Sequence, residues 1–220
     1  MKVFVAIPSY DRKICCETAR ALLDEQGAAA MSGIDMVTGF VPGTAYVHQA
    51  RDICAREFLA SDADRVVFID ADVSWAPGSV VKIATSPHDF VGGAYRFKRE
   101  PEGYPVEWIV ERPQLLSDPE THCIEVAALP GGFLSLSRAV FAGMLAAHPE
   151  RAYSHEGHPL FGFWHCPPGA GEDGTFCEEW RALGGRVWLE PTLTLTHVDG
   201  GRAYTGCIGD WLRSRMKEVA

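Results

Sequence analysis

The chain has 220 residues, 47% of them hydrophobic and 22% charged, and its formal net charge at pH 7 is -9. This length is enough for one well-buried domain, and the acidic balance weakens the case for a broadly basic nucleic-acid-binding face. No stretch is apolar for long enough to cross a bilayer, and the apolar run at residues 3–7 is too short for a signal peptide. Seven cysteines without a Cys-x-x-Cys pair predict reduced thiols in a cytoplasmic protein.

Apolar and amphipathic segments alternate through the first part of the chain. Runs of β-branched and aromatic residues predict buried strands, and segments with helical periodicity predict helices between them. The expected strands are residues 3–7, 34–40, 65–69 and 90–97, and the expected helices are residues 15–26, residues 45–60 and a third that begins at Pro77. This alternation predicts an α/β fold in which a mostly parallel, mixed sheet is flanked by helices on both faces.

The second half of the chain has a less regular pattern. It predicts a helix at residues 139–147 and strands at residues 106–110, 124–129 and 187–198, the last with a kink at Pro191. Residues 153–171 are rich in glycine, proline, histidine and aromatic residues, which predicts a functional or mobile loop. There is no linker and no internal repeat, so we expect a single domain.

The strongest chemical signal follows the expected strand at residues 65–69. Asp70 and Asp72 are two positions apart, so on an extended strand their carboxylates would point to the same side. Ligands of open α/β sheets bind at the carboxyl ends of strands, and two oxygen ligands there suit Mg²⁺ or Mn²⁺, with substrate phosphates completing the shell. The alternative is a turn acid followed by a helix cap ahead of Pro77.

Three other groups of residues allow more than one interpretation. Arg96, Lys98 and Arg99 form a basic patch, which we interpret as a solvated loop. Gly131 and Gly132 allow the backbone to approach a ligand closely, or they form a bulge in a strand. A zinc site would draw on His155, His158, His165, Cys166 and Cys177. Their spacing is not that of paired zinc ligands, so we do not favour it.

Six short motifs follow one another along the chain. They are Pro8-Ser9-Tyr10 after the first strand, Ala50-Arg51-Asp52 on the second helix, Asp70-Ala71-Asp72, Pro130-Gly131-Gly132, Glu172-Asp173 at a helix start, and Gly185-Arg186-Val187 leading to His197. In this order they resemble the motifs of GT-A glycosyltransferases, especially small bacterial and phage members related to family two. The chain departs from the family's pattern at Asp52, where asparagine is usual.

The resemblance implies a GT-A-like, Rossmann-like fold with a nucleotide-binding half at about residues 1–100 and an acceptor and catalytic half at about residues 101–220. It implies that Asp173 is the catalytic base, that Trp164 and Glu172 contact the acceptor, and that Asp70, Asp72 and His197 hold Mn²⁺ or Mg²⁺. The implied donor-binding residues are Pro8, Ser9, Tyr10, Arg51, Asp70, Ala71, Gly131 and Gly132.

The residues by themselves also have structural interpretations. Glu172 and Asp173 stand before a helical run, where carboxylates cap a helix and interact favourably with its dipole. His197 alone would more often be a structural histidine, although imidazole is a natural ligand for metals such as Mn²⁺. Trp164 could stack on a sugar or cover the core.

Taken together, the motifs predict an enzyme that moves a sugar from a nucleotide-diphosphate donor to an acceptor hydroxyl with inversion, and a UDP-sugar is the first donor to consider. The acceptor candidates are a growing glycan, a small metabolite, a protein and a hydroxymethylated base of phage DNA. A sugar-nucleotide-binding protein and a nucleotidyltransferase are the alternatives. The second usually has a Gly-rich phosphate loop after the first strand, where this chain has Pro8-Ser9-Tyr10-Asp11.

Overall fold

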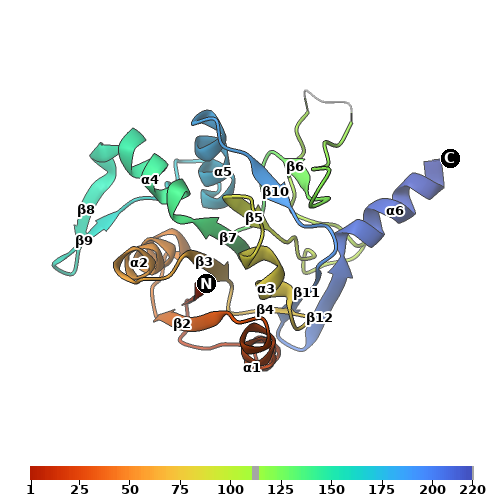
Figure 1. Cartoon of the computed structure of the whole chain (residues 1–220), viewed down its shortest axis with the longest axis horizontal. Helices are drawn as coiled ribbons and strands as arrows, with labels where there is room; N and C mark the ends of the chain where they lie inside the picture. The colour runs from red at the N-terminus through yellow and green to blue at the C-terminus, as the bar shows by residue number, and fades with distance from the viewer. Residues whose placement is uncertain (111–113, 220) are drawn as a thin grey trace.

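A computed structural model describes residues 1–110 and 114–219 as a mixed α/β protein (Figure 1). Its elements are β1 (Lys2–Ser9), α1 (Cys16–Met31), β2 (Asp35–Pro42), α2 (Val47–Ala60), β3 (Arg65–Ile69), β4 (Val73–Trp75), α3 (Ser79–Ala84), β5 (Phe90–Gly92), β6 (Ile124–Val126), β7 (Phe133–Ser137), α4 (Arg138–Ala147), the short 3-10 helix η1 (Pro149–Arg151), β8 (Ala152–His155), β9 (His158–Phe161), α5 (Glu172–Ala182), β10 (Val187–Leu189), β11 (Thr194–Asp199), β12 (Arg202–Cys207) and α6 (Ile208–Val219).

A seven-stranded sheet lies at the centre, with the strand order β2-β1-β3-β7-β5-β10-β6. β1 is parallel to β2 and β3, and β10 is parallel to β5. β7 runs antiparallel to both β3 and β5, and β6 runs antiparallel to β10. All strands except β7 and β6 therefore point the same way, which confirms the predicted α/β fold with a mostly parallel, mixed sheet.

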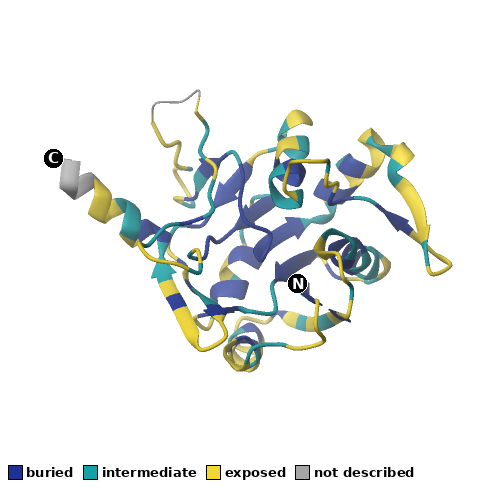
Figure 2. Cartoon of the chain, turned by 180° about the vertical axis from the view of Figure 1, so that it is seen from behind, coloured by how far each residue is buried: buried dark blue, intermediate teal, exposed yellow. Residues whose placement is uncertain are grey.

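Helices cover both faces of this sheet, so the central strands β1 and β3 are buried on both sides. Side chains of β1 alternate between the two faces. Phe4 packs in the core that contains Phe58 of α2 and Phe141 of α4, whereas Val5 packs in the core that contains Leu22 of α1. Figure 2 shows the buried residues along the central strands between these layers.

Two smaller β structures lie beside the central sheet. β4, β11 and β12 form an antiparallel sheet, and β8 pairs with β9 in a hairpin. The single strand that the sequence predicts at residues 187–198 is therefore wrong, because β10 belongs to the large sheet and β11 to the small one. The chain changes sheets at Pro191, where the missing N–H prevents regular pairing.

Several other predicted bounds differ from the structure. Residues 106–110 contribute only an isolated bridge between Glu107 and Ala128, and the strand expected at residues 90–97 ends at Gly92. α3 begins at Ser79 rather than Pro77 because Gly78 has a φ of 87°, which no helical residue adopts. Buried Glu25 of α1 accepts hydrogen bonds from the backbone N–H groups of Gly78 (2.8 Å) and Val81 (2.9 Å) at this helix start. The sequence pattern did not predict β4, the β8–β9 hairpin, β12 or α6.

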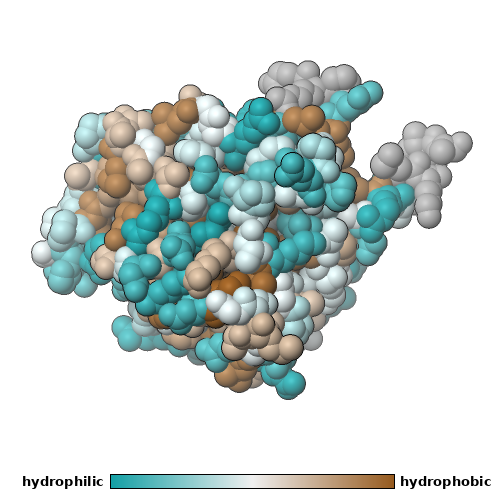
Figure 3. All heavy atoms as spheres, viewed as in Figure 1, coloured by the Kyte–Doolittle hydropathy of each residue, from teal (hydrophilic) through white to brown (hydrophobic). Residues whose placement is uncertain are grey.

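Within the described ranges 1–110 and 114–219, no helix has both the length and the apolar character that crossing a membrane requires. Hydrophilic residues are spread across the face of the molecule shown in Figure 3.

Candidate active site at the ends of β1 and β3

A cavity of about 650 Å³ opens where β1 and β3 end. Pro8, Ser9 and Tyr10 line it from the end of β1, and Asp70, Ala71 and Asp72 line it after β3. The carboxyl ends of parallel strands are the usual ligand site of such sheets. The structure therefore brings five of the eight predicted donor-binding residues to one cavity, namely Pro8, Ser9, Tyr10, Asp70 and Ala71.

Asp70 and Asp72 reach this cavity from a turn and not from a strand. β3 ends at Ile69, and the backbone N–H of Val73 donates to the carbonyl of Asp70 (3.0 Å), which closes the turn. The predicted side-chain alternation is therefore wrong for these two residues, although both line the cavity. The backbone N–H of Asp70 also donates to the carbonyl of Gly132 (3.1 Å), which fixes the turn against the segment before β7.

Arg51 of α2 joins three carboxylates behind this turn. Its Nη2 donates to Oδ1 of Asp70 (3.0 Å), and its Nη1 donates to Oε1 of Glu172 (3.0 Å) and to Oδ1 of Asp173 (2.5 Å). The guanidinium is only 2% exposed, whereas the side chains of Asp70 and Asp173 keep exposures of 25% and 28%. Arg51 therefore orients these acids from beneath and does not itself line the cavity. Burial lowers the pKa of Arg51, but Asp173 and Asp70 outweigh that effect and raise it above its usual value.

Gly131 and Gly132 are glycines because carboxylates occupy the space that a side chain would need. A Cβ at Gly131 would overlap Oδ1 of Asp173, and one at Gly132 would overlap Oδ2 of Asp70. These two residues, with Arg51, were predicted to bind the donor. The structure places all three next to the acids, where they hold Asp70 and Asp173 in position.

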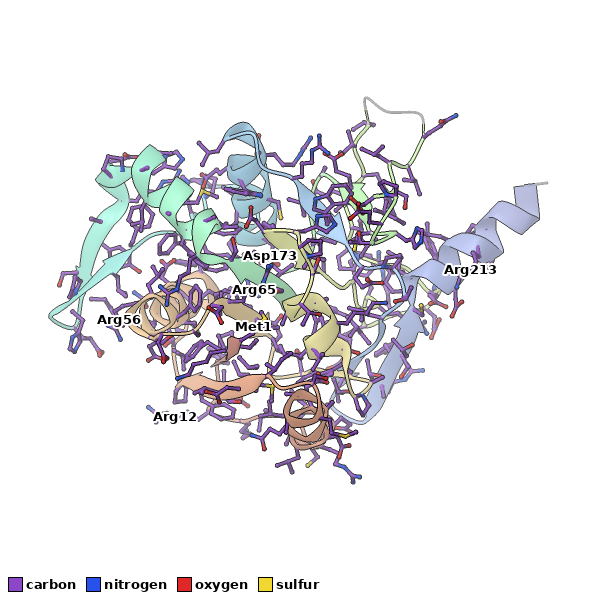
Figure 4. The ribbon with its side chains drawn as sticks, viewed as in Figure 1. Met1, Arg12, Arg56, Arg65, Asp173 and Arg213 are labelled. Carbon is purple, nitrogen blue, oxygen red and sulfur yellow. The ribbon has the colours of Figure 1, made fainter. Side chains whose placement is uncertain are left out.

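Asp173 lies in the first turn of α5, at the end of the helix that faces the middle of the sheet (Figure 4). Its Oδ2 accepts a hydrogen bond from the backbone N–H of Gly131 (2.8 Å), while its Oδ1 meets Arg51. Burial raises the pKa of Asp173 above that of an ordinary carboxyl, and Arg51 offsets part of this rise. A held, partly exposed carboxylate with a raised pKa has the properties of a general base.

Asp72 meets two cationic or polar side chains at its Oδ2. Nζ of Lys98 lies 2.6 Å from this oxygen, and Nε2 of His197 lies 3.6 Å from it. Nδ1 of His197 is 2.9 Å from the carbonyl of Arg96; because a carbonyl only accepts, Nδ1 carries a proton there and Nε2 faces Asp72. Burial would raise the pKa of Asp72, but His197 and Lys98 lower it to about 2.

The predicted trio of metal ligands is not assembled in this structure. The described residues contain no group of three His, Cys, Asp or Glu side chains placed to hold one metal ion, and this applies equally to the zinc alternative. Asp70 does not join the predicted trio because both of its carboxylate oxygens have other partners. Its Oδ1 meets Arg51, and its Oδ2 accepts a hydrogen bond from Oη of Tyr95 (3.3 Å). Asp72 and His197 remain together, so metal binding by these two stays a prediction.

The predicted contact of Trp164 with the acceptor is wrong. Trp164 is 1% exposed and stacks on Phe176, with ring centroids 4.5 Å apart, so no face of its indole is open to a sugar. The predicted mobile loop also contains regular structure, because β8 and β9 lie within residues 152–161. The acceptor contact assigned to Glu172 stays a prediction; its carboxylate is paired with Arg51.

Asp52 holds the segment that contains Trp164. Its Oδ1 accepts hydrogen bonds from the backbone N–H groups of Phe163 (2.9 Å) and Trp164 (3.1 Å), and its Oδ2 accepts one from the hydroxyl of Tyr153 (3.0 Å). Burial raises the pKa of Asp52 to about 7. Asp52 therefore faces away from the cavity and holds the β8–β9 hairpin and the segment after it against α2.

Sequence reasoning missed two side chains of the site, Tyr95 and Lys98. Burial raises the pKa of Tyr95 well above its usual value, so its hydroxyl stays protonated and donates to Asp70. No local pattern marks Tyr95. Lys98 was noticed as part of a basic patch, and the preferred interpretation as a solvated loop is wrong for this residue, since it contacts Asp72 and lines the cavity.

No protein-family model matches the sequence, and no curated protein matches it. Among solved structures, the chain resembles GalNAc-T7 with UDP, GalNAc and Mn²⁺, at 11% identity and a TM-score of 0.47, over 90% of this chain and 44% of that one. It resembles TarS 1-349 of S. aureus with UDP-GlcNAc at 12% identity and a TM-score of 0.49, over 86% and 56% of the two chains. The same TarS fragment alone gives 12% and 0.48, over 93% and 60%. The chain thus spans about half of the length of these solved chains.

Proposed function

We propose that this protein is a glycosyltransferase that moves a sugar from a nucleoside-diphosphate donor, a UDP-sugar, to an acceptor hydroxyl. One observation carries the proposal: Arg51 joins Asp70, at the wall of the strand-end cavity, to Asp173 at the start of α5. One guanidinium therefore holds both the turn whose acids would meet the donor and the carboxylate that would act as base on the acceptor. The resemblance of the ordered motifs to GT-A enzymes supports the same assignment.

The residues at the cavity wall would contact the nucleotide and its diphosphate. Pro8, Ser9 and Tyr10 border the nucleotide, as their place in the cavity wall allows. The diphosphate lies beside Asp72, the cavity acid that meets Lys98 and His197. Most nucleotide contacts then come from residues up to about 100, and Asp173 and His197 come from the remainder of the chain.

Asp72 and His197 fit a divalent cation of the Mn²⁺ or Mg²⁺ kind, and Asp70 does not. Nε2 of His197 and Oδ2 of Asp72 are 3.6 Å apart, and the hydrogen bond from Nδ1 to the Arg96 carbonyl orients the ring with Nε2 outward. Few protein ligands suffice for such ions when substrate phosphates complete the shell. A bound cation would neutralise charge on the departing diphosphate.

Asp173 is proposed as the base that takes the proton of the acceptor hydroxyl as it attacks the sugar carbon. Its carboxylate keeps some exposure, and burial raises its pKa, which makes it a stronger base than an ordinary carboxylate. Because attack and departure then take place on opposite faces of the sugar carbon, we propose inversion of the anomeric centre.

A nucleotide panel tests the proposal. The protein is mixed with UDP, UDP-sugars and other nucleoside diphosphates, with and without Mn²⁺, and its thermal unfolding is recorded. A ligand at about a hundred times its dissociation constant should stabilise by roughly 2.7 kcal/mol. Donors that bind are then incubated with candidate acceptors, and NMR of the product reports the anomeric configuration. Failure of every nucleoside diphosphate to raise the unfolding temperature would contradict the proposal.

A further inference from the structure

Lys98 lies in the cavity and has no part in the mechanism proposed above. It lies in the segment between β5 and β6, is half-buried, and lines the same cavity as Asp70 and Asp72. Its Nζ is 2.6 Å from Oδ2 of Asp72, so the ammonium group stands directly against the carboxylate.

The two residues that precede Lys98 are held by hydrogen bonds. The N–H of Phe97 donates to the carbonyl of Gly103 (2.9 Å). Arg96 donates to Oε2 of Glu100 (2.8 Å) and to the carbonyl of Thr205 in β12 (3.3 Å). These contacts fix the residue next to Lys98 in place, so the approach of its ammonium to Asp72 is supported by the fold.

Lys98 contacts the oxygen of Asp72 that faces His197. Nζ of Lys98 and Nε2 of His197 both approach the same oxygen, Oδ2 of Asp72. A cation shared by Asp72 and His197 would lie beside this oxygen, within a few ångströms of the ammonium. Two positive charges that close repel strongly in a partly buried site.

We propose that Lys98 and a divalent cation compete for Asp72, and that Lys98 supplies the positive charge of the diphosphate subsite when no metal is bound. The inference rests on the proposed nucleoside-diphosphate site for its second half only. It follows that the protein binds a nucleoside diphosphate without metal through Lys98, and that metal entry requires the ammonium to leave Asp72.

The first experiment measures Mn²⁺ binding without any nucleotide, by calorimetry and by the EPR signal of free Mn²⁺. Lys98→Met should raise Mn²⁺ affinity by about tenfold or more, because the competing ammonium is gone. Lys98→Arg keeps the charge and should bind Mn²⁺ as weakly as the wild type. Lys13→Met removes a cation from the same cavity that pairs with Asp11 rather than Asp72, so it should change the affinity much less.

The second experiment measures UDP binding in the presence of a chelator. The wild type and Lys98→Arg should bind, and Lys98→Met should bind about tenfold more weakly. Unchanged or weaker Mn²⁺ binding by Lys98→Met would overturn the competition, whatever the nucleotide result. Tighter Mn²⁺ binding by Lys98→Met, with no UDP binding by any variant in either condition, would retain the competition and contradict the proposed glycosyltransferase function instead.

Discussion

Two regions meet at α2, and consecutive residues of that helix serve them. Arg51 turns toward the cavity and pairs with Asp70, Glu172 and Asp173, whereas Asp52 turns toward the β8–β9 hairpin and accepts hydrogen bonds from neutral groups only. Both side chains are 2% exposed. A buried cation surrounded by carboxylates keeps its charge, while a buried carboxylate with neutral donors is easier to protonate. The first region therefore keeps charged side chains in place, and the second uses a carboxylate to fasten the β8–β9 hairpin and the segment after it to α2.

The largest effect that separates these regions should come from Asp173→Asn. The substitution keeps the shape of the side chain but removes the basic oxygen, so turnover should fall by about 10²–10⁴-fold. UDP binding, measured by calorimetry, should change little. Glu172→Gln is the matched control, because Glu172 also pairs with Arg51, and its turnover should fall much less. Near-normal turnover of Asp173→Asn would make Asp173 a structural acid.

Arg51→Met should produce the largest loss of stability. It leaves Asp70, Glu172 and Asp173 close together without their counter-charge, and breaking such a buried cluster costs about 3–5 kcal/mol of unfolding free energy. Urea denaturation measures the change. Arg56→Met, on the same helix but only half-buried, should cost less than about 1 kcal/mol. Equal losses for the two variants would show that the Arg51 cluster contributes no special stability.

Asp52→Asn tests the opposite property of the hairpin region. Burial raises the pKa of Asp52 from its ordinary value of 3.8 to about 7, so between these pH values the folded protein holds a proton that the unfolded chain has released. The contribution of Asp52 to wild-type stability should therefore be full below about pH 4, fall by about 2–4 kcal/mol as the pH rises through about 7, and level off above that.

Asparagine at position 52 can still accept from the N–H groups of Phe163 and Trp164 but has no proton to lose. The difference between the wild-type and Asp52→Asn unfolding free energies, measured in urea from pH 4 to pH 8, isolates the contribution of Asp52. A difference that does not depend on pH would contradict this assignment.

Asp72→Asn should have the smallest of the four effects. Calorimetry should show that Mn²⁺ no longer increases UDP affinity, a loss of about tenfold, equal to 1.4 kcal/mol. The protein should stay folded, because Asp72 lies on a turn at the cavity. Asp199→Asn changes a second acid of the same cavity, one that is exposed, and should leave the effect of Mn²⁺ intact. An undiminished Mn²⁺ effect in Asp72→Asn would remove Asp72 from the metal site.

The sequence by itself determined the elements whose signal is local. The run of residues 65–69 has the bounds of β3. The acids that follow it lie at the strand-end cavity, which is where ligands of such sheets bind. The α/β class follows for the same reason, since alternating strands and helices leave few ways to bury both faces of a sheet. The sequence likewise predicts Glu172 and Asp173 at a helix start, and they lie in the first turn of α5.

Only the tertiary structure decided which groups these acids meet. Arg51 reaches Asp173 across 122 positions of the chain, and Lys98 reaches Asp72 across 26, which no local periodicity encodes. Trp164 has the same residue type whether it faces a sugar or the core. Its contacts with Phe68 of β3, Phe141 of α4 and Phe176 of α5 settled that it is buried. Strand and helix patterns depend on neighbours in sequence, whereas the charge and burial of a site depend on segments that become neighbours only when the chain folds.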